Sequence, residues 1–156
     1  GVDYQDNMER LLKKFDRARS ELPKALFTDA AKDTSVGVIF YGSTTAAMYE
    51  ALHELERDNR FIDALRIRSF PFGDEVTDFI NDHDSVFVVE QNRDAQMRQL
   101  LITESGVDPQ KLTSVLHYDG SPITARFIRT SITKAIGALQ LNKKRNVTQN
   151  IWKKTY

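Results

Sequence analysis

Two short, wholly apolar runs lie in the chain, at residues 36–40 and 86–89. Each is too short for a helix and rich in β-branched or aromatic residues, so each predicts a strand buried on both faces of a sheet. Residues 64–68 alternate between apolar and polar positions, with two arginines on one face, which is the periodicity of a strand with one polar face. Residues 114–117 predict a fourth, shorter strand.

Between these strands, apolar residues recur every three or four positions, as in helices with one buried face. The pattern predicts helices over residues 7–20, 44–58, 74–81, 95–105 and 123–139, and Asp6 with Glu9 forms a capping-box pattern at the start of the first. Strands alternating with helices predict an α/β fold with three layers, α/β/α, in which helices cover both faces of a mostly parallel sheet.

Burial predicts the order of the four parallel strands. The two wholly apolar strands belong in the centre and the strand with the arginines lies nearer an edge, so the strands numbered along the chain take the order 2-1-3-4. This order places a topological switch point between the two central strands, and open α/β sheets bind ligands beyond the carboxyl ends of the strands at such a point. The expected segments are a linker helix at 1–24, an α/β domain at 25–141 and a loose basic tail at 142–156.

Polar residues gather where the predicted parallel strands end, and these ends share one rim of the sheet. Gly42, Ser43 and Thr44 precede a helix, whose free N–H groups can hold an anion. An N-cap by Ser43 or Thr44 after a tight turn is the simpler interpretation. The loop has one glycine and matches no phosphate-binding motif.

The segment after the strand at 86–89 carries the most hydrogen-bonding side chains on this rim. Asn92 and Asp94 fit a helix start, as N-cap and as first-turn acid. The polar residues that exceed what capping requires are Glu90, Gln91, Arg93 and Gln96. For these, contact with a ligand or partner and a purely structural role both stay open.

Two further candidates lie at the other strand ends. His117 with Asp119 has the elements of a general base and its orienting acid, but neighbours within one turn seldom reach that geometry, so a structural or interface histidine is the expectation. Arg66 and Arg68 either face water or reach acids on a partner, because unpaired burial of a charge is unfavourable.

Composition excludes several classes of function. The net charge of zero gives no overall field that attracts nucleic acid, and no apolar run is long enough for a membrane span. The chain has no cysteine, so it offers no thiolates to a disulfide, a zinc site or an Fe–S cluster, and three scattered histidines show no metal-binding spacing. We expect a cytoplasmic protein without a metal site, with no nucleic-acid or membrane partner.

Four segments, taken together, resemble one enzyme family. VIFYGST at 38–44, LRIRSFPF at 65–72, VVEQNRDAQMR at 88–98 and LHYDGSPITARFI at 116–128 resemble, in this order and spacing, the C-terminal part of the α subunit of 2-oxoacid:ferredoxin oxidoreductases, the 2-oxoglutarate type most closely. The resemblance extends over about residues 3–136.

The resemblance implies a part of a thiamine diphosphate enzyme that decarboxylates a 2-oxoacid, transfers the acyl group to coenzyme A and reduces ferredoxin. Thiamine diphosphate, Mg²⁺ and the Fe–S cluster would then belong to other domains or subunits, with the rest of the α subunit and a β subunit as partners. The domain resembles the transketolase C-terminal domain, which implies an antiparallel edge strand near residues 25–28 that makes the arginine strand internal.

The resemblance assigns no catalytic residue to this chain, and the isolated domain is expected to be inactive. Its motifs imply contacts at the rim with the missing domains, the β subunit or coenzyme A, through Gly42–Thr44, Glu90–Gln96 and the segment from His117 to Arg126. The alternative is a free-standing module that binds a phosphate of coenzyme A or of a nucleotide, through Gly42–Thr44 and Arg93.

Overall fold

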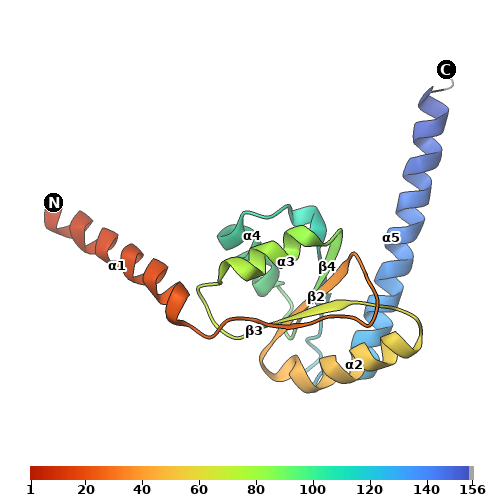
Figure 1. Cartoon of the computed structure of the whole chain (residues 1–156), viewed down its shortest axis with the longest axis horizontal. Coiled ribbons are helices and arrows are strands. Elements are labelled where there is room, and N and C mark those ends of the chain that lie inside the picture. The colour runs from red at the N-terminus through yellow and green to blue at the C-terminus, as the bar shows by residue number, and fades with distance from the viewer. Residues whose placement is uncertain (155–156) are drawn as a thin grey trace.

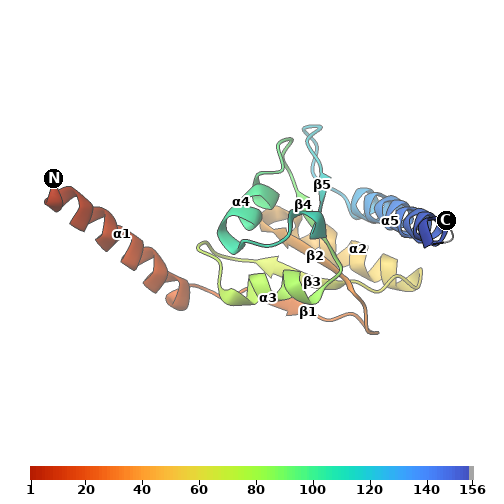
Figure 2. The ribbon, with the colours of Figure 1, turned by 90° about the horizontal axis from the view of Figure 1, so that it is seen from above.

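The structure is a computed structural model that describes residues 1–154, with side chains to residue 139. A five-stranded sheet separates two layers of helices (Figures 1 and 2). The strands are β1 Leu26–Thr28, β2 Val36–Tyr41, β3 Asp63–Ile67, β4 Ser85–Glu90 and β5 Leu112–Leu116. The α-helices are α1 Val2–Glu21, α2 Thr45–Arg57, α3 Asp74–Asp82, α4 Gln96–Ser105 and α5 Ala125–Lys154, with short 3-10 turns at Gly42–Thr44 and Pro109–Lys111.

The sheet has the strand order β1-β3-β2-β4-β5. Strands β2 to β5 are parallel, and β1 pairs antiparallel with β3, with Phe27 opposite Leu65. If the parallel strands β2, β3, β4 and β5 are numbered 1 to 4 along the chain, their order in the sheet is the predicted 2-1-3-4. The α/β class, the three layers and the antiparallel edge strand are therefore confirmed.

Each face of the sheet has its own apolar core. Val38, Phe40 and Phe87 point to the side covered by α2 and α5, where they pack with residues such as Met48 and Ile128. Strand residues that point to the other side, covered by α3 and α4, include Ile39 of β2, Leu65 of β3, and Val86 and Val88 of β4. Burial on both faces explains why β2 and β4 are apolar at nearly every position.

Both terminal helices differ from their predicted bounds. Helix α1 begins at Val2, so Asp6 lies inside the helix and does not cap it; the predicted capping box is wrong. Helix α5 continues to Lys154, past the end predicted at 139, and replaces the loose tail expected from residue 142 on. The apolar spacing stops at 139, but no Pro or Gly follows to end the helix. Residues 155–156 lie outside the described part of the chain.

A close contact at Gly37 gives the first prediction. A Cβ at this position of β2 would lie 2.8 Å from Cε1 of Phe79 and 3.2 Å from Cγ of His83, both on buried side chains of the α3 segment. Gly37→Ala is expected to lower the free energy of unfolding by about 1–3 kcal/mol in urea denaturation, because the packed core has to shift. Gly137→Ala is the matched control, since a Cβ there meets nothing within 4 Å.

The control is expected to be neutral or to stabilise by up to about 1 kcal/mol, because alanine favours the helix. Equal unfolding free energies for the two variants would show that α3 does not pack closely on β2.

Candidate functional site

The carboxyl ends of β2 and β4 lie side by side at the switch point, and one side chain bridges them. Gln91, just after β4, donates from Nε2 to Oγ of Ser43 at 3.0 Å and to Oγ1 of Thr44 at 3.2 Å. Ser43 and Gln91 are exposed, whereas Thr44 is buried. The two loops predicted to meet at the rim therefore do meet, and the amide of Gln91 fixes their spacing.

The turn before α2 places Thr44 at the N-cap position, one of the two predicted residues, but without a capping side-chain bond. Gly42 has φ 57°, in the left-handed region that glycine adopts without strain. No side chain caps α2 through the hydroxyls of Ser43 or Thr44. Instead Oγ1 of Thr45 donates to the carbonyl of Gly42 at 2.6 Å. Thr44 thus holds the predicted N-cap position of α2, but the hydroxyls of Ser43 and Thr44 accept from Gln91 and make no capping bond to the helix.

Glu90, the last residue of β4, is a buried acid that supports the start of α4. Its side chain has no exposed surface. Oε2 accepts from the amide of Asn92 at 2.6 Å and from the backbone N–H of Met97 at 2.9 Å, and Oε1 accepts from the N–H of Arg98 at 3.3 Å. The carboxylate thus satisfies free N–H groups at the start of α4 and complements the positive end of that helix. It lies under the rim and offers no surface to a partner.

Asn92 also supports this helix start, but not as the predicted N-cap residue. The N-cap position is Ala95, in the left-handed region with φ 52°. Oδ1 of Asn92 accepts from the N–H of Asp94 at 3.0 Å and of Gln96 at 3.4 Å. Glu90 and Asn92 together therefore do what one capping residue does elsewhere.

The pKa of Tyr41 is raised above 10.0, mainly because the phenol is partly buried and secondly because of the negative charge of Glu90. A hydrogen bond with Asn92 lowers the pKa but does not cancel these effects. The neutral phenol is thus favoured in the folded state, so the unfolded state binds fewer protons above pH 10, and stability falls as the pH rises from there through the folded pKa. Glu90→Gln is expected to lower the pKa of Tyr41, measured by a pH titration of ¹³C-labelled tyrosine rings. An unchanged pKa would contradict the charge contribution.

Arg93 and Gln96 are the exposed members of the same segment. Arg93 grips its neighbour Asp94 with two bonds, from Nε to Oδ1 at 2.7 Å and from Nη2 to Oδ2 at 3.3 Å. Any acid on a partner has to compete with this pair, which is weak because both side chains are solvated. Arg93 and Gln96 both remain candidate contacts, since both are exposed.

His117 and Asp119 form a turn after β5. The imidazole is buried and packs edge-on against Phe127, with ring centroids 4.7 Å apart, and its Nε2 lies 3.5 Å from Oδ1 of Asp119. That same oxygen accepts from the N–H and the hydroxyl of Ser121, and these bonds are the main reason why the pKa of Asp119 is lowered. The carboxylate is thus occupied in shaping the turn.

The two arginines of the β3 segment have different environments. Arg68 lies just past the strand and donates from Nε to the carbonyl of Lys24 at 2.7 Å, which holds the connection between α1 and β1. Arg66 is half-buried between β1 and β2, and its buried Nε has no hydrogen-bond partner among the described residues. A donor in this state favours a partner that brings an acceptor.

Arg126 borders a crevice at the same rim. The crevice holds about 560 Å³ between the first turns of α2 and α5 and is lined by residues that include Ala46, Glu50, Thr124 and Arg126. Both helices begin here, so their free N–H groups and the exposed guanidinium of Arg126 favour binding of an anion at the mouth. The negative charges of Glu50 and Glu54, which also line the crevice, disfavour it.

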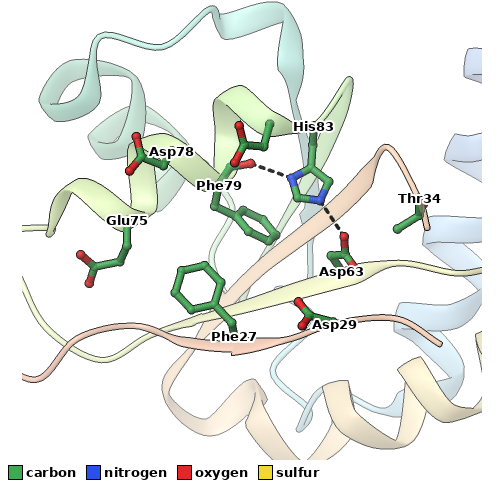
Figure 3. A pocket seen from close by; sticks show the side chains of 9 residues that line it. Phe27, Asp29, Thr34, Asp63, Glu75, Asp78, Phe79 and His83 are labelled. Carbon is green, nitrogen blue, oxygen red and sulfur yellow. Dashed lines mark hydrogen bonds and ion pairs between the residues drawn. The ribbon is translucent and has the colours of Figure 1, made fainter. Parts of the chain in front are cut away.

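One cavity was missed by the sequence analysis. About 440 Å³ lies at the amino end of β3, away from the rim, between β1 and α3 (Figure 3). The buried His83 contacts the carbonyl of Phe79 through Nδ1 at 2.6 Å and Oδ2 of Asp63 through Nε2 at 3.1 Å. The acids that line the cavity are Asp29, Asp63, Glu75, Asp78 and Asp82. Asp63 and His83 are 20 residues apart in the sequence and meet only in the folded chain, so no local sequence motif predicts their contact.

No described group of three His, Asp or Glu residues is placed to hold a metal ion. Within the described residues, no helix combines the length and the apolar character that a membrane crossing requires.

Solved structures share this fold. No family model and no curated protein sequence matches the chain. The 2-oxoglutarate:ferredoxin oxidoreductase from Magnetococcus marinus, solved with 2-oxoglutarate, coenzyme A and succinyl-CoA bound, matches 85% of this chain with a TM-score of 0.75 and 18% identity. A split-gene transketolase, an inactive β4 tetramer, matches 72% of the chain with a TM-score of 0.56 and 19% identity, over 41% of its own length.

A third likeness is weaker. The α chain of a probable 2-oxoacid ferredoxin oxidoreductase from Thermoplasma acidophilum matches 73% of this chain and 97% of its own, at 23% identity and a TM-score of 0.49. The present chain spans only 23% of the length of the Magnetococcus marinus chain. The shared feature is the fold, that of an α/β domain also found within an oxidoreductase and a transketolase.

Proposed function

We propose that the chain is the C-terminal domain of the α subunit of a thiamine diphosphate-dependent 2-oxoacid:ferredoxin oxidoreductase in the cytoplasm, with 2-oxoglutarate as the expected 2-oxoacid. In this proposal the domain stabilises the assembly and does not catalyse alone. The whole enzyme makes acyl-CoA and CO₂ and passes the released electrons to ferredoxin.

The observation that carries the proposal is that the fold likeness and the sequence resemblance point to the same enzyme. The Magnetococcus marinus oxidoreductase aligns with 85% of the chain. The four segments that resemble this family in sequence, at 38–44, 65–72, 88–98 and 116–128, each cross or adjoin the carboxyl end of a parallel strand. A fold alone does not determine function, so this coincidence at one rim adds the specific support.

The residues of this chain fit a contact surface better than a reaction centre. Glu90 and Asp119 are occupied by helix and turn contacts, whereas Ser43, Gln91, Arg93 and Arg126 are exposed along the rim. Without cysteine the chain has no thiolate for an Fe–S cluster. The proposal therefore places the cluster, thiamine diphosphate and Mg²⁺ in other domains or subunits.

The test compares the isolated chain with the complete enzyme encoded around it. The complete enzyme is expected to reduce methyl viologen when given 2-oxoglutarate and coenzyme A, and the isolated chain is expected to show no turnover. Turnover by the isolated chain would refute the non-catalytic role. A gene that encodes no pyrimidine-binding domain upstream and has no β-subunit gene beside it would refute the family assignment.

The crevice beside Arg126 supports one alternative, a module that binds a phosphate of coenzyme A or of a nucleotide. Calorimetry of the isolated chain with millimolar coenzyme A separates the two functions. Heat that is lost in Arg126→Gln would favour the module. The absence of heat and of a change in melting temperature would exclude it for the isolated domain.

A further inference from the structure

Helix α1 extends away from the α/β domain in both views (Figures 1 and 2). None of its residues is buried. Its large apolar side chains are strongly exposed, with Tyr4 at 69%, Met8 at 44%, Leu11 at 45% and Phe15 at 54% of their maximal area. A helix of this length with an uncovered apolar stripe gains little stability by itself, so the stripe calls for a partner.

The stripe has the spacing of a coiled-coil seam. Its positions are Tyr4, Met8, Leu11, Phe15, Ala18 and Leu22, which follow one another at intervals of four, three, four, three and four residues. Alternating steps of three and four repeat every seven residues, which keeps one narrow stripe facing a single partner helix. The occupant that fits this surface is therefore another helix with the same repeat.

The base of α1 offers a groove to that second helix. About 390 Å³ lies between the last turns of α1 and the loop after β3, and mostly apolar side chains line it. The lining residues are Leu11, Lys14, Phe15, Ala18, Leu22, Phe70 and Pro71. Phe70 is itself 43% exposed. The seam thus continues from α1 onto the surface of the α/β domain.

The charges of α1 identify the second helix and its direction. Residues 2–9 carry only acidic charges, at Asp3, Asp6 and Glu9, whereas residues 10–21 carry a net charge of +3. Two such helices attract each other when they run antiparallel, because each acidic half then lies beside a basic half. A parallel pair would place like charges together.

We propose that α1 forms an antiparallel coiled coil with α1 of a second copy of this chain. In this arrangement Met8 faces Ala18 of the other copy, Leu11 faces Phe15, and Tyr4 faces Leu22 at the groove. Every layer of the seam then pairs a residue of one copy with a seam residue of the other, and the small Ala18 leaves room for Met8. The inference concerns α1 alone and stands independently of the proposed oxidoreductase function.

The first experiment measures association of the whole chain by sedimentation equilibrium between about 1 and 200 µM. The wild-type chain is expected to form a dimer. Leu11→Gln/Phe15→Gln is expected to raise the Kd by more than about 100-fold, since two apolar seam contacts are lost. The matched control is Lys13→Gln/Arg17→Gln, which introduces the same side chains outside the seam and is expected to change the Kd by less than about 10-fold.

The second experiment determines the direction of pairing. The chain has no cysteine, so an introduced thiol is the only one in the protein. Chains with Met8→Cys mixed with chains with Ala18→Cys are expected to form a disulfide-linked pair on mild oxidation. Met8→Cys chains alone are not, because in the antiparallel pair their Cα atoms lie about 15 Å apart along the axis, beyond the reach of a disulfide.

Three results would overturn the proposal. These are a monomer at 200 µM, a disulfide between two copies of Met8→Cys, which indicates parallel helices, and flotation of the wild-type chain with anionic lipid vesicles, which assigns the apolar stripe to a membrane surface. The melting temperature of each variant serves as a folding control. It is expected to match wild type when measured below the dimer Kd, because α1 has no buried residue.

Discussion

Replacing Glu90 by alanine is expected to lower the free energy of unfolding by about 3 kcal/mol, measured by urea denaturation. The carboxylate accepts from the amide of Asn92 and from the N–H groups of Met97 and Arg98 in a site without solvent. Removing it leaves these donors without their acceptor, at about 1–3 kcal/mol for each buried group left unpaired, offset in part because a buried charge no longer has to be desolvated.

A site-specific measurement accompanies this prediction. The amide hydrogens of Met97 and Arg98 are expected to exchange faster with solvent in Glu90→Ala, because the first turn of α4 opens more often. Glu104→Ala is the matched control, since Glu104 lies on the exposed face of the same helix. Its effect is expected to stay within about 0.5 kcal/mol. Equal stabilities of the two variants would show that Glu90 does not hold the start of α4.

Replacing His83 by alanine is expected to lower the free energy of unfolding by about 2–4 kcal/mol, because a packed side chain with two polar contacts is lost from a buried site. The ring connects the end of α3 to Asp63 of β3 and lies 4.3 Å, centroid to centroid, from the ring of Phe79. Asp63 in turn accepts from the N–H of Ala30 at 2.8 Å, so the contact extends to the segment after β1.

His53→Ala is the matched control, since His53 is exposed on α2. Its effect is expected to stay within about 0.5 kcal/mol in the same denaturation experiment. The two ring nitrogens of His83 lie within hydrogen-bond distance of two oxygen atoms, on Phe79 and Asp63. A loss of stability no larger than that of His53→Ala would contradict the prediction.

The sheet could be predicted from the sequence because its signals are local. β2 and β4 are apolar at nearly every position, which indicates central strands whatever their surroundings. Arg66 in β3 and Arg68 just after it place that strand further out. The edge strand β1 has only three residues, all exposed, so its own pattern is uninformative. It was expected only from the resemblance to the transketolase C-terminal domain.

The rim shows where sequence reasoning stopped. The strand order predicts that Ser43 and Gln91 lie in neighbouring loops. Their hydrogen bond depends on side-chain geometry, which residue spacing in the sequence does not encode. Glu90 is more instructive. Its position at a strand end leaves a contact role and a structural role both open, and the structure shows that its carboxylate turns inward to a helix that begins six residues later. Burial of a charge becomes favourable there only because the helix start supplies donors.

Arg66 has a consequence for finding partners of the chain. Its Nε is buried without an acceptor among the described residues, so the isolated chain folds with an unmet donor beside the edge strand. A molecule that supplies a carboxylate or carbonyl there binds the folded state alone and raises the melting temperature by mass action. A thermal-shift screen that compares the wild-type chain with Arg66→Met would therefore report any partner that reaches this nitrogen, because only the wild-type chain would be stabilised.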